Sequence, residues 1–369
     1  MAAPPKAREG NPAASAGKPI VAGVASFLRP LSARATNADL WAALEVLAVQ
    51  DEGLDRLERI HDVSLDNEAR RRYSAYIAQA RQYFNSVAMV EPIAKPLLGY
   101  YFALNLTKAF LTAVDPDYTA GELQHGLTQD VDRKRRYYFQ QEGFKIKQSG
   151  VFRLLAEETG QGFCYANNHR LQVAKLLPYL ADGYDLYGDI ADEAPKLLPI
   201  KDAFVLFGGK KGWIRVEVDR NVLRQRAMRP ESLLSRARIF GGRFRLVQTE
   251  LDTASYETMT SYPYAIRRSD ILDDLVLEFD NSLIANQRNV SGGRRYIVLS
   301  LRKDLLSHEA VTFALLHHLS NMVRYRPHDV ERLRGSAYFW LFASWVDRGC
   351  ENYLLAIASR ITREEHVVV

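Results

Sequence analysis

Apolar side chains recur every three or four positions along the first part of the chain. NADLWAALEVLAV, residues 37–49, shows this spacing, and it returns in residues 66–89 and in KPLLGYYFALNLTKAFLTAV, residues 95–114. Such spacing places the apolar side chains on one helical face, and Pro96 suits the first turn of the last segment. The pattern predicts three helices. They follow a stretch rich in Pro, Ala and Gly, residues 1–36, which is typical of a disordered extension.

The middle of the chain favours strands. FKIKQSGVFRLL alternates apolar and polar residues around Ser149-Gly150, which predicts a hairpin. Residues 168–188 show helical spacing, and we expect a helix that breaks near Pro178. Residues 202–219 carry apolar, β-branched arms on both sides of GGKKG. Two further strands are predicted directly after the glycine pairs of GGRFRLVQTEL and GGRRYIVLSL.

Helical spacing returns near the C-terminus, in LSHEAVTFALLHHLSNMVRY and in the segments that follow it. We therefore expect an α+β fold in which the N- and C-terminal helices pack together and a strand-rich subdomain is inserted between them. The predicted parts are a disordered extension (1–36), an N-terminal helical part (37–114), a mixed and basic middle region (115–303) and a C-terminal helical part (304–369).

Composition narrows the class of protein. With 369 residues, 47% apolar and 25% charged, the chain is typical of a soluble globular protein of one or two domains. Two cysteines are too few for a disulfide framework, so we expect a cytoplasmic protein. No apolar run approaches the roughly 18 residues that cross a bilayer, so no membrane partner is predicted.

The net charge of +5 is concentrated in one region. Residues 201–303 hold 19 basic and 12 acidic residues, whereas the rest of the chain is close to neutral. Clustered Lys and Arg attract phosphate groups, so a nucleotide or a nucleic acid is the expected partner. An Arg-rich surface that is merely solvated is the alternative. A homodimer or a partner protein is also left open.

Three glycine-pair turns carry basic residues. Backbone amides at paired glycines can approach a ligand closely, and the adjacent cation supplies charge for phosphate. The alternative is that these are ordinary tight turns with soluble tips. The basic residues of GGKKG and GGRR are ligand-binding candidates: Lys210, Lys211, Arg294 and Arg295.

The stretch HHLSNMVRYRP, residues 317–327, gathers polar side chains on one helix. At about 100° per residue, His317, Asn321 and Arg324 share a face, while His318 lies at the border with the apolar side. Histidine transfers protons near neutral pH and arginine binds phosphate, so His317 is a catalytic candidate and Asn321, Arg324 and Arg326 are ligand-binding candidates. A solvated helix end that stops at the proline is the alternative.

Two other patterns, one of acidic residues and one of Arg and His, bear on function. Paired carboxylates in SDILDDLVLEFD are typical of the wet side of an amphipathic helix, so no metal site is predicted, and no cofactor is identified. An Arg followed four to six residues later by His is the short signature of HEPN-like ribonucleases, and Arg56 and His61 match it. Such a match is expected by chance in this chain, and it keeps a ribonuclease of stress response or phage defence as an alternative.

One longer segment resembles a known family. Residues 95–128, followed by basic residues and FKIKQSGVF, are similar to the YaaC-like proteins of bacteria, which join a Y-x-x-x-N-L-x-K-A helix to a V-D-P-x-Y loop, a His-Gly pair and a K-x-G hairpin. LSNMVRYRP also resembles a helix of that family that ends in an Arg-Tyr pair. The matching residues of the longer segment are Tyr101, Asn105, Lys108, Asp115, Pro116, His125 and Gly126.

The resemblance implies a bacterial cytosolic protein and no settled reaction. It adds Asn105 and Lys108 as ligand-binding candidates and His125 as a second catalytic candidate. If the terminal helices pack together, these residues meet the polar face of residues 317–324. The leading hypothesis is a site for a phosphate-bearing ligand, with Lys108 and Arg324 holding phosphate. A non-enzymatic interaction protein is the third alternative, and it would expose apolar surface on the terminal helices.

Overall fold

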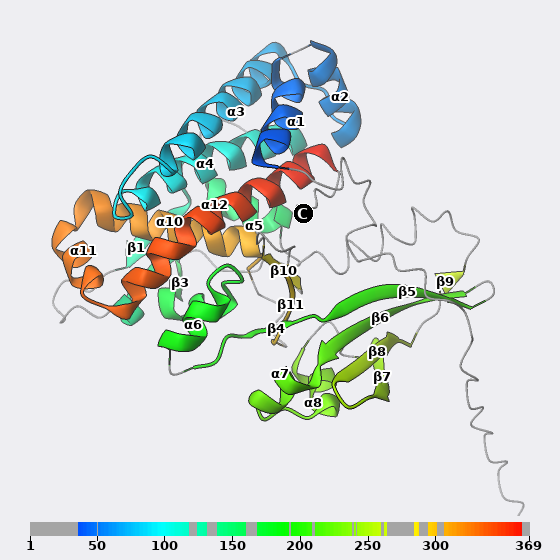
Figure 1. Ribbon diagram of the computed structural model, residues 1–369. Coiled ribbons are helices and arrows are strands. Elements are labelled where there is room, and N and C mark those ends of the chain that lie inside the picture. Colours follow the sequence, from blue (N-terminus) through cyan, green and yellow to red (C-terminus); the bar gives the residue numbers. More distant parts are fainter. Residues whose placement is uncertain are drawn as a thin grey trace, which may run out of the picture.

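Four consecutive helices form the N-terminal part of the protein, and they pack together at the top of Figure 1. The predicted helices exist, but the sequence pattern missed a separate short helix before the second of them. Asp66 begins that second helix by accepting a hydrogen bond from the Ala69 amide. The four are α1 (Asn37–Val49), α2 (Asp51–His61), α3 (Asn67–Val87) and α4 (Lys95–Val114).

The computed structural model describes most of the chain. Several stretches lie outside the described residues, among them the N-terminal extension and the acidic segment SDILDDLVLEFD. Lys210 also lies outside them. They are residues 36–49, 51–117, 124–130, 139–159, 168–191, 193–208, 211–237, 240, 242–259, 262–263, 284–287, 294–300 and 306–363.

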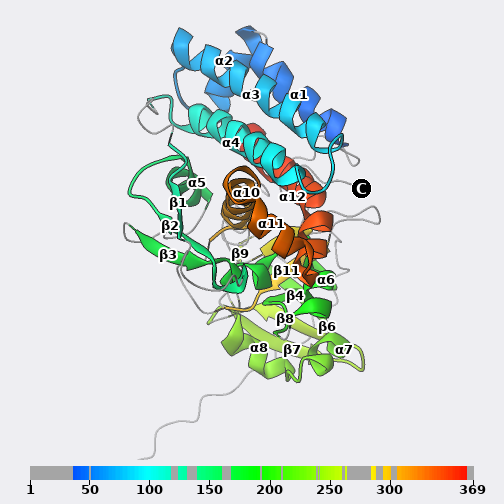
Figure 2. The same ribbon diagram turned by 90° about the vertical axis from the view of Figure 1, so that its left-hand side faces the viewer.

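Three C-terminal helices pack on the N-terminal ones, so the expected union of the two ends of the chain is present (Figures 1 and 2). The break before the last helix falls at Gly335-Ser336, and the helix continues through Gly349, where the Trp345 ring lies against the glycine. Both α10 and α12 contact α4. The three are α10 (His308–Tyr325), α11 (Pro327–Arg334) and α12 (Ala337–Thr362).

Helix α4 is the centre of this bundle. Of the described helices, it is the one that is long and apolar enough to cross a membrane, contrary to the expectation that no apolar run approaches that length. However, 72% of its apolar window is buried inside the protein. Its apolar side chains, among them Tyr100 and Phe102, contact α3, α10 and α12. The apolar character of α4 therefore reflects a core position in the bundle.

A small antiparallel sheet packs beside α10, and here two predictions were wrong. Ser149-Gly150 is not a hairpin, because helix α5 (Val151–Thr159) begins directly after it. The expected helix at residues 168–188 is instead a strand, two short 3₁₀ turns and helix α6 (Tyr184–Ile190). The sheet has the order β1 (Leu127–Asp130), β2 (Gly143–Ile146) and β3 (His169–Gln172).

The remaining strands form two further antiparallel sheets with their own small core (Figure 1). GGKKG connects two paired strands, as predicted, and strands follow GGRF and GGRR. One sheet joins β10 (Ile284–Gln287), β11 (Arg294–Val298) and β4 (Leu197–Pro199). The other holds β5 (Asp202–Gly208), β6 (Lys211–Asp219), β8 (Thr253–Thr258), β7 (Phe244–Thr249) and β9 (Tyr262–Pro263), beside α7 (Arg220–Gln225) and α8 (Pro230–Arg236). The fold is α+β, as expected.

Candidate functional site

His125 is fixed by an unusually close crossing of two chain segments. Gly126 and Gly150 both have positive φ, and a Cβ atom on Gly150 would lie 2.6 Å from the Gly126 backbone. The Phe152 amide donates to the His125 carbonyl at 3.2 Å, and the Val151 amide donates to Gln124 at 2.9 Å. Only glycine permits this approach and these dihedral angles. The His-Gly pair therefore attaches His125 to the start of α5.

The His125 ring points toward α4 and α10. Its Nδ1 forms a hydrogen bond with the hydroxyl of Tyr100, a fully buried residue of α4. The ring centroid of His317, on α10, lies 5.8 Å from that of His125 and 5.2 Å from that of Tyr100. The structure thus brings together the two histidines that the sequence nominated.

Asn321 and Arg324 determine which nitrogen of His317 is protonated. Arg324 donates to the Asn321 oxygen at 3.0 Å, and a guanidinium can only donate. The Asn321 amide nitrogen therefore faces His317, and it donates to the nearer ring nitrogen, Nε2 at 2.9 Å, whereas Nδ1 is 3.4 Å away. Because Nε2 must accept this bond, the proton of the neutral ring is on Nδ1. Asn321 acts as a spacer between cation and imidazole.

Arg324 itself has aromatic and neutral partners. It donates to the Tyr101 hydroxyl at 3.0 Å, and its guanidinium lies 5.7 Å from the Tyr101 ring centre and 4.9 Å from that of Tyr325. Its Nε is buried without a hydrogen-bond partner. Among the described residues, no carboxylate pairs with Arg324. A half-buried cation without a counter-charge favours an anionic ligand.

Lys108 and Asn105 occupy the same helix as Tyr101. Lys108 lies over the Tyr76 ring, 5.4 Å from its centre, and no described carboxylate forms an ion pair with it. Burial alone lowers the pKa of Lys108. Asn105 is buried and donates to the Tyr101 carbonyl one turn earlier, at 2.8 Å. Lys108 is therefore a second half-buried cation of this site, whereas the Asn105 amide supports the helix.

Both histidines are held neutral. Burial, followed by the charges of Arg324 and Lys108, lowers the pKa of His125 below its ordinary value. Burial, with smaller effects from His125, His318 and Arg324, lowers the pKa of His317 to about 3. His317 is 3% exposed, whereas His125 is half-buried. We name Tyr100, Tyr101, Lys108, His125, His317, Asn321 and Arg324 the histidine cluster.

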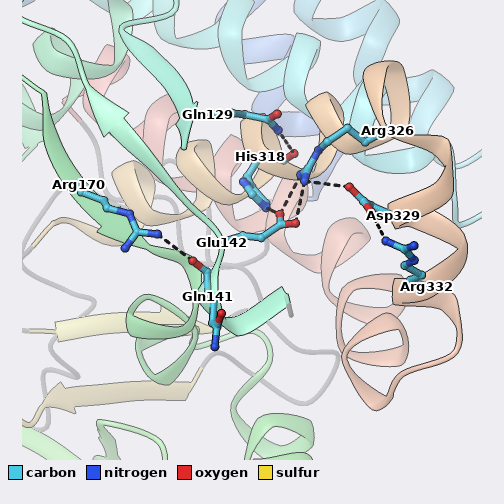
Figure 3. A network of polar contacts seen from close by, with 8 residues as sticks. All are labelled: Gln129, Gln141, Glu142, Arg170, His318, Arg326, Asp329 and Arg332. Atoms are coloured by element: carbon cyan, nitrogen blue, oxygen red, sulfur yellow. Dashed lines mark hydrogen bonds and ion pairs between the residues drawn. The ribbon is translucent and has the colours of Figure 1, made fainter. Parts of the chain in front are cut away.

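The neighbouring His318 and Arg326 belong to a different group, shown in Figure 3. Glu142, which is 5% exposed, receives two hydrogen bonds from Arg326 at 2.7 and 2.8 Å. The Nε2 atom of His318 lies 2.7 Å from the same carboxylate, and Arg326 also pairs with Asp329 at 3.2 Å. We name Glu142, His318, Arg326 and Asp329 the carboxylate cluster. Its arginine is already neutralised within the protein.

Burial makes the Glu142 carboxyl harder to ionise, but its partners outweigh this effect. Hydrogen bonds and charges from His318 and Arg326 hold its pKa at about 2, below the ordinary 4.5. Glu142 follows the short 3₁₀ turn η3 (Phe139–Gln141) and precedes β2. The carboxylate cluster therefore ties the small sheet to the ends of α10 and α11.

The expected polar face of α10 is not solvated. His317, His318 and Asn321 are all buried, because α4 covers one side of the helix and the small sheet lies against the other. The sequence identified this face correctly, but it gave no sign of Tyr100 or Glu142. Tyr100 resembles the other core aromatic residues of α4, and Glu142 has no motif around it.

Three of the glycine-turn candidates lie at the starts of described strands. Lys211 begins β6 in the five-stranded sheet, where its backbone pairs with Gly208 and Pro263. Arg294 and Arg295 begin β11 in the three-stranded sheet. The described strands thus place the two basic turns in two different sheets.

Arg56 and His61, the HEPN-like pair, have different surroundings. His61 is buried, and its Nε2 lies 2.7 Å from the Ile361 carbonyl of α12. Burial, partly opposed by that hydrogen bond, lowers the pKa of His61. Arg56 is exposed on α2. The described residues also contain no group of three His, Cys, Asp or Glu side chains that could hold a metal ion.

Comparison with known proteins agrees with the resemblance seen in residues 95–128. No curated protein matches the chain. No solved structure matches it either. The family model described as YaaC-like protein matches residues 49–361, which include every described member of both clusters. The chain belongs to the YaaC-like protein family.

Proposed function

We propose that this protein binds a phosphate-bearing ligand, a nucleotide or a nucleic acid, at the histidine cluster. One observation carries the proposal. Arg324 and Lys108 are half-buried cations near His125, and the described residues give neither of them a carboxylate partner. Burial of unpaired charge is costly, and a bound phosphate would offset that cost with charge-assisted hydrogen bonds.

The contacts refine the roles expected of each residue. Arg324 and Lys108 hold the anion, and each terminal nitrogen of Arg324 keeps a second N–H besides the one it donates to Tyr101 or Asn321. His125 is the histidine that a ligand reaches, because His317 is closed off by Tyr100 and Asn321. Asn321 and Asn105 orient protein groups, since their amides already bond within the protein. If the site is catalytic, His125 transfers the proton and His317 positions the His125 ring.

A neutral His125 is suited to this role. Its lowered pKa leaves it uncharged near neutral pH, so it can donate or accept one hydrogen bond. A bound phosphate would add negative charge beside it and raise its pKa. Ligand binding would therefore favour protonation of His125, and protonation would favour ligand binding. The affinity for the ligand would increase as the pH falls through the range in which His125 titrates.

The two alternatives have less support. A HEPN-like ribonuclease needs an open Arg56/His61 pair, but His61 is buried against Ile361. An interaction module would expose apolar surface on the terminal helices, and the exposed side chains of Val49 on α1, Tyr325 on α10 and Trp340 on α12 are what favours it. Membership of the family and the two cysteines lead us to propose a bacterial, cytoplasmic location as well.

Calorimetric titration with inorganic tripolyphosphate, with ATP and with a single-stranded oligonucleotide tests the proposal. We expect at least one of these to bind, and Arg324→Ala to weaken its binding roughly tenfold or more, because a hydrogen bond to a charged group is lost. Arg334→Ala, at an arginine that is 62% exposed, is the matched control and keeps wild-type affinity. Equal affinities of the two variants would contradict the assignment.

A further inference from the structure

A stripe of aromatic and cationic side chains from α3, α4 and the end of α10 includes part of the histidine cluster. We propose that this stripe binds single-stranded nucleic acid across at least two nucleotides. The inference builds on the proposed phosphate site and names its ligand class. The stripe consists of Tyr76, Tyr83, Tyr101, Lys108, Arg324 and Tyr325.

Each end of the stripe combines a cation with aromatic rings. At the first, the Lys108 ammonium lies over the Tyr76 ring. At the second, the Arg324 guanidinium contacts the Tyr101 and Tyr325 rings, and Tyr83 stacks on Tyr101 with 5.3 Å between centroids. Each end thus offers a phosphate-binding cation beside aromatic surface. This combination is how proteins bind single strands without reading their sequence.

Helix geometry sets the distance between the ends. Tyr76 and Tyr83 are seven residues apart on α3, and Tyr101 and Lys108 are seven apart on α4, so each pair lies on one helical face. At 1.5 Å of rise per residue, the ends are separated by roughly 10 Å along the helices. One phosphate group is too small to span that separation, whereas a strand carries a series of phosphates that can reach both ends.

Ring placement distinguishes a strand from a mononucleotide. A mononucleotide has one base and could use one of the two ends. Here the half-buried Tyr76 ring stands at one end, and the Tyr325 ring, 68% exposed, stands at the other. The charges of both cations lower the pKa of His125, so His125 lies near both ends of the stripe. A linker between two stacked bases would therefore pass His125.

The charges along the stripe fit a polyanion. No described carboxylate forms an ion pair with either cation, and burial is what lowers the pKa of Lys108. Arg72, one turn before Tyr76 on α3, pairs with Glu68, and a strand would not depend on it. On this side, Lys108 is therefore the last cation of the stripe.

Fluorescence anisotropy with the full chain tests the inference. The probe is a labelled oligothymidylate or oligouridylate of about twelve nucleotides, within the usual site size of single-strand binding. Tyr325→Ala and Tyr76→Ala are each expected to weaken its binding roughly tenfold, since a stacked base is lost. Tyr325→Phe and Tyr76→Phe keep the ring and restore affinity. Trp340→Ala, at an exposed ring outside the stripe, is the control.

Salt dependence supplies a second readout. For single strands, each neutralised phosphate contributes roughly 0.7 to the slope of log affinity against log salt concentration. Lys108→Ala and Arg324→Ala should each reduce the slope by about that amount, while the tyrosine variants leave it unchanged. An unchanged slope in both cation variants would contradict contact with two phosphates.

The outcomes separate this inference from the proposed function. If tripolyphosphate or ATP binds through Arg324, but the alanine variants of both tyrosines bind the oligonucleotide like wild type, the phosphate site stands and the strand is rejected. Binding of duplex DNA as tight as that of the single strand would also overturn it, because paired bases cannot stack on the rings. If no probe binds, both proposals fail. Comparison of oligothymidylate with oligouridylate tells whether the strand is DNA or RNA.

Discussion

Two neighbouring arginines of one helix end differ in what surrounds them. Arg324 meets tyrosines and an asparagine, whereas Arg326 meets the carboxylates of Glu142 and Asp329. The adjacent histidines divide in the same way, since His317 joins the first cluster and His318 the second. A cation that the fold neutralises serves the fold, and a cation that it leaves unpaired is available to a ligand. The same residue types, two positions apart, thus have different uses.

The largest expected effect compares the two arginines directly. Arg326 is 15% exposed, and Arg326→Ala would leave the buried Glu142 carboxylate without the guanidinium that donates two hydrogen bonds to it. We expect the free energy of unfolding to fall by roughly 3–5 kcal/mol. Arg324→Ala breaks hydrogen bonds to neutral groups and no described ion pair, so a loss of about 1 kcal/mol is expected. Urea unfolding of both variants measures the difference, and equal losses would remove the distinction between the clusters.

The acid side of the stability curve is expected to show the next largest effect. Glu142 has a folded pKa of about 2 against an ordinary 4.5, so the folded state retains a charge that the unfolded chain loses first. Its contribution is complete above about pH 4.5 and disappears as the pH falls toward 2, by roughly 3 kcal/mol in total.

Glu142→Gln makes this acid effect specific. The variant cannot titrate at this position, so its unfolding free energy should vary less between pH 4.5 and pH 2 than that of the wild type. Glu331→Gln, at a side chain that is 64% exposed, should follow the wild-type curve. Parallel curves for wild type and Glu142→Gln would show that the carboxylate is not held charged.

The sequence predicted the parts of the fold that depend on local periodicity. The apolar stripes of α1, α3, α4 and α10 are helical in the structure because one face of each enters the core. The failures lie between residues 149 and 190, where the chain forms short strands and turns. There the conformation depends on distant contacts, such as Gly150 against Gly126, which no local pattern records.

The histidine cluster shows the same division. Spacing on α10 placed His317, Asn321 and Arg324 on one face, and the structure joins them by hydrogen bonds. His125 was nominated through the family resemblance, since its contact with α10 depends on tertiary packing. Glu142 was missed, because its partner Arg326 is 184 positions away and a lone glutamate carries no signal.

The smallest expected effect is a shift in the titration of His125. Burial and then the charges of Arg324 and Lys108 lower its pKa below the ordinary 6.5. Removing either cation, by Arg324→Ala or Lys108→Ala, should therefore move the pKa of His125 upward, by less than the effect of burial, which remains. NMR titration of the imidazole nitrogens measures this, and His317 should stay neutral through the same range because its pKa is about 3. Arg334→Ala leaves the curve in place. If the pKa of His125 stays unchanged in both variants, His125 does not interact with these cations. The histidine cluster would then lack the anion-binding character that distinguishes it from the carboxylate cluster around Glu142.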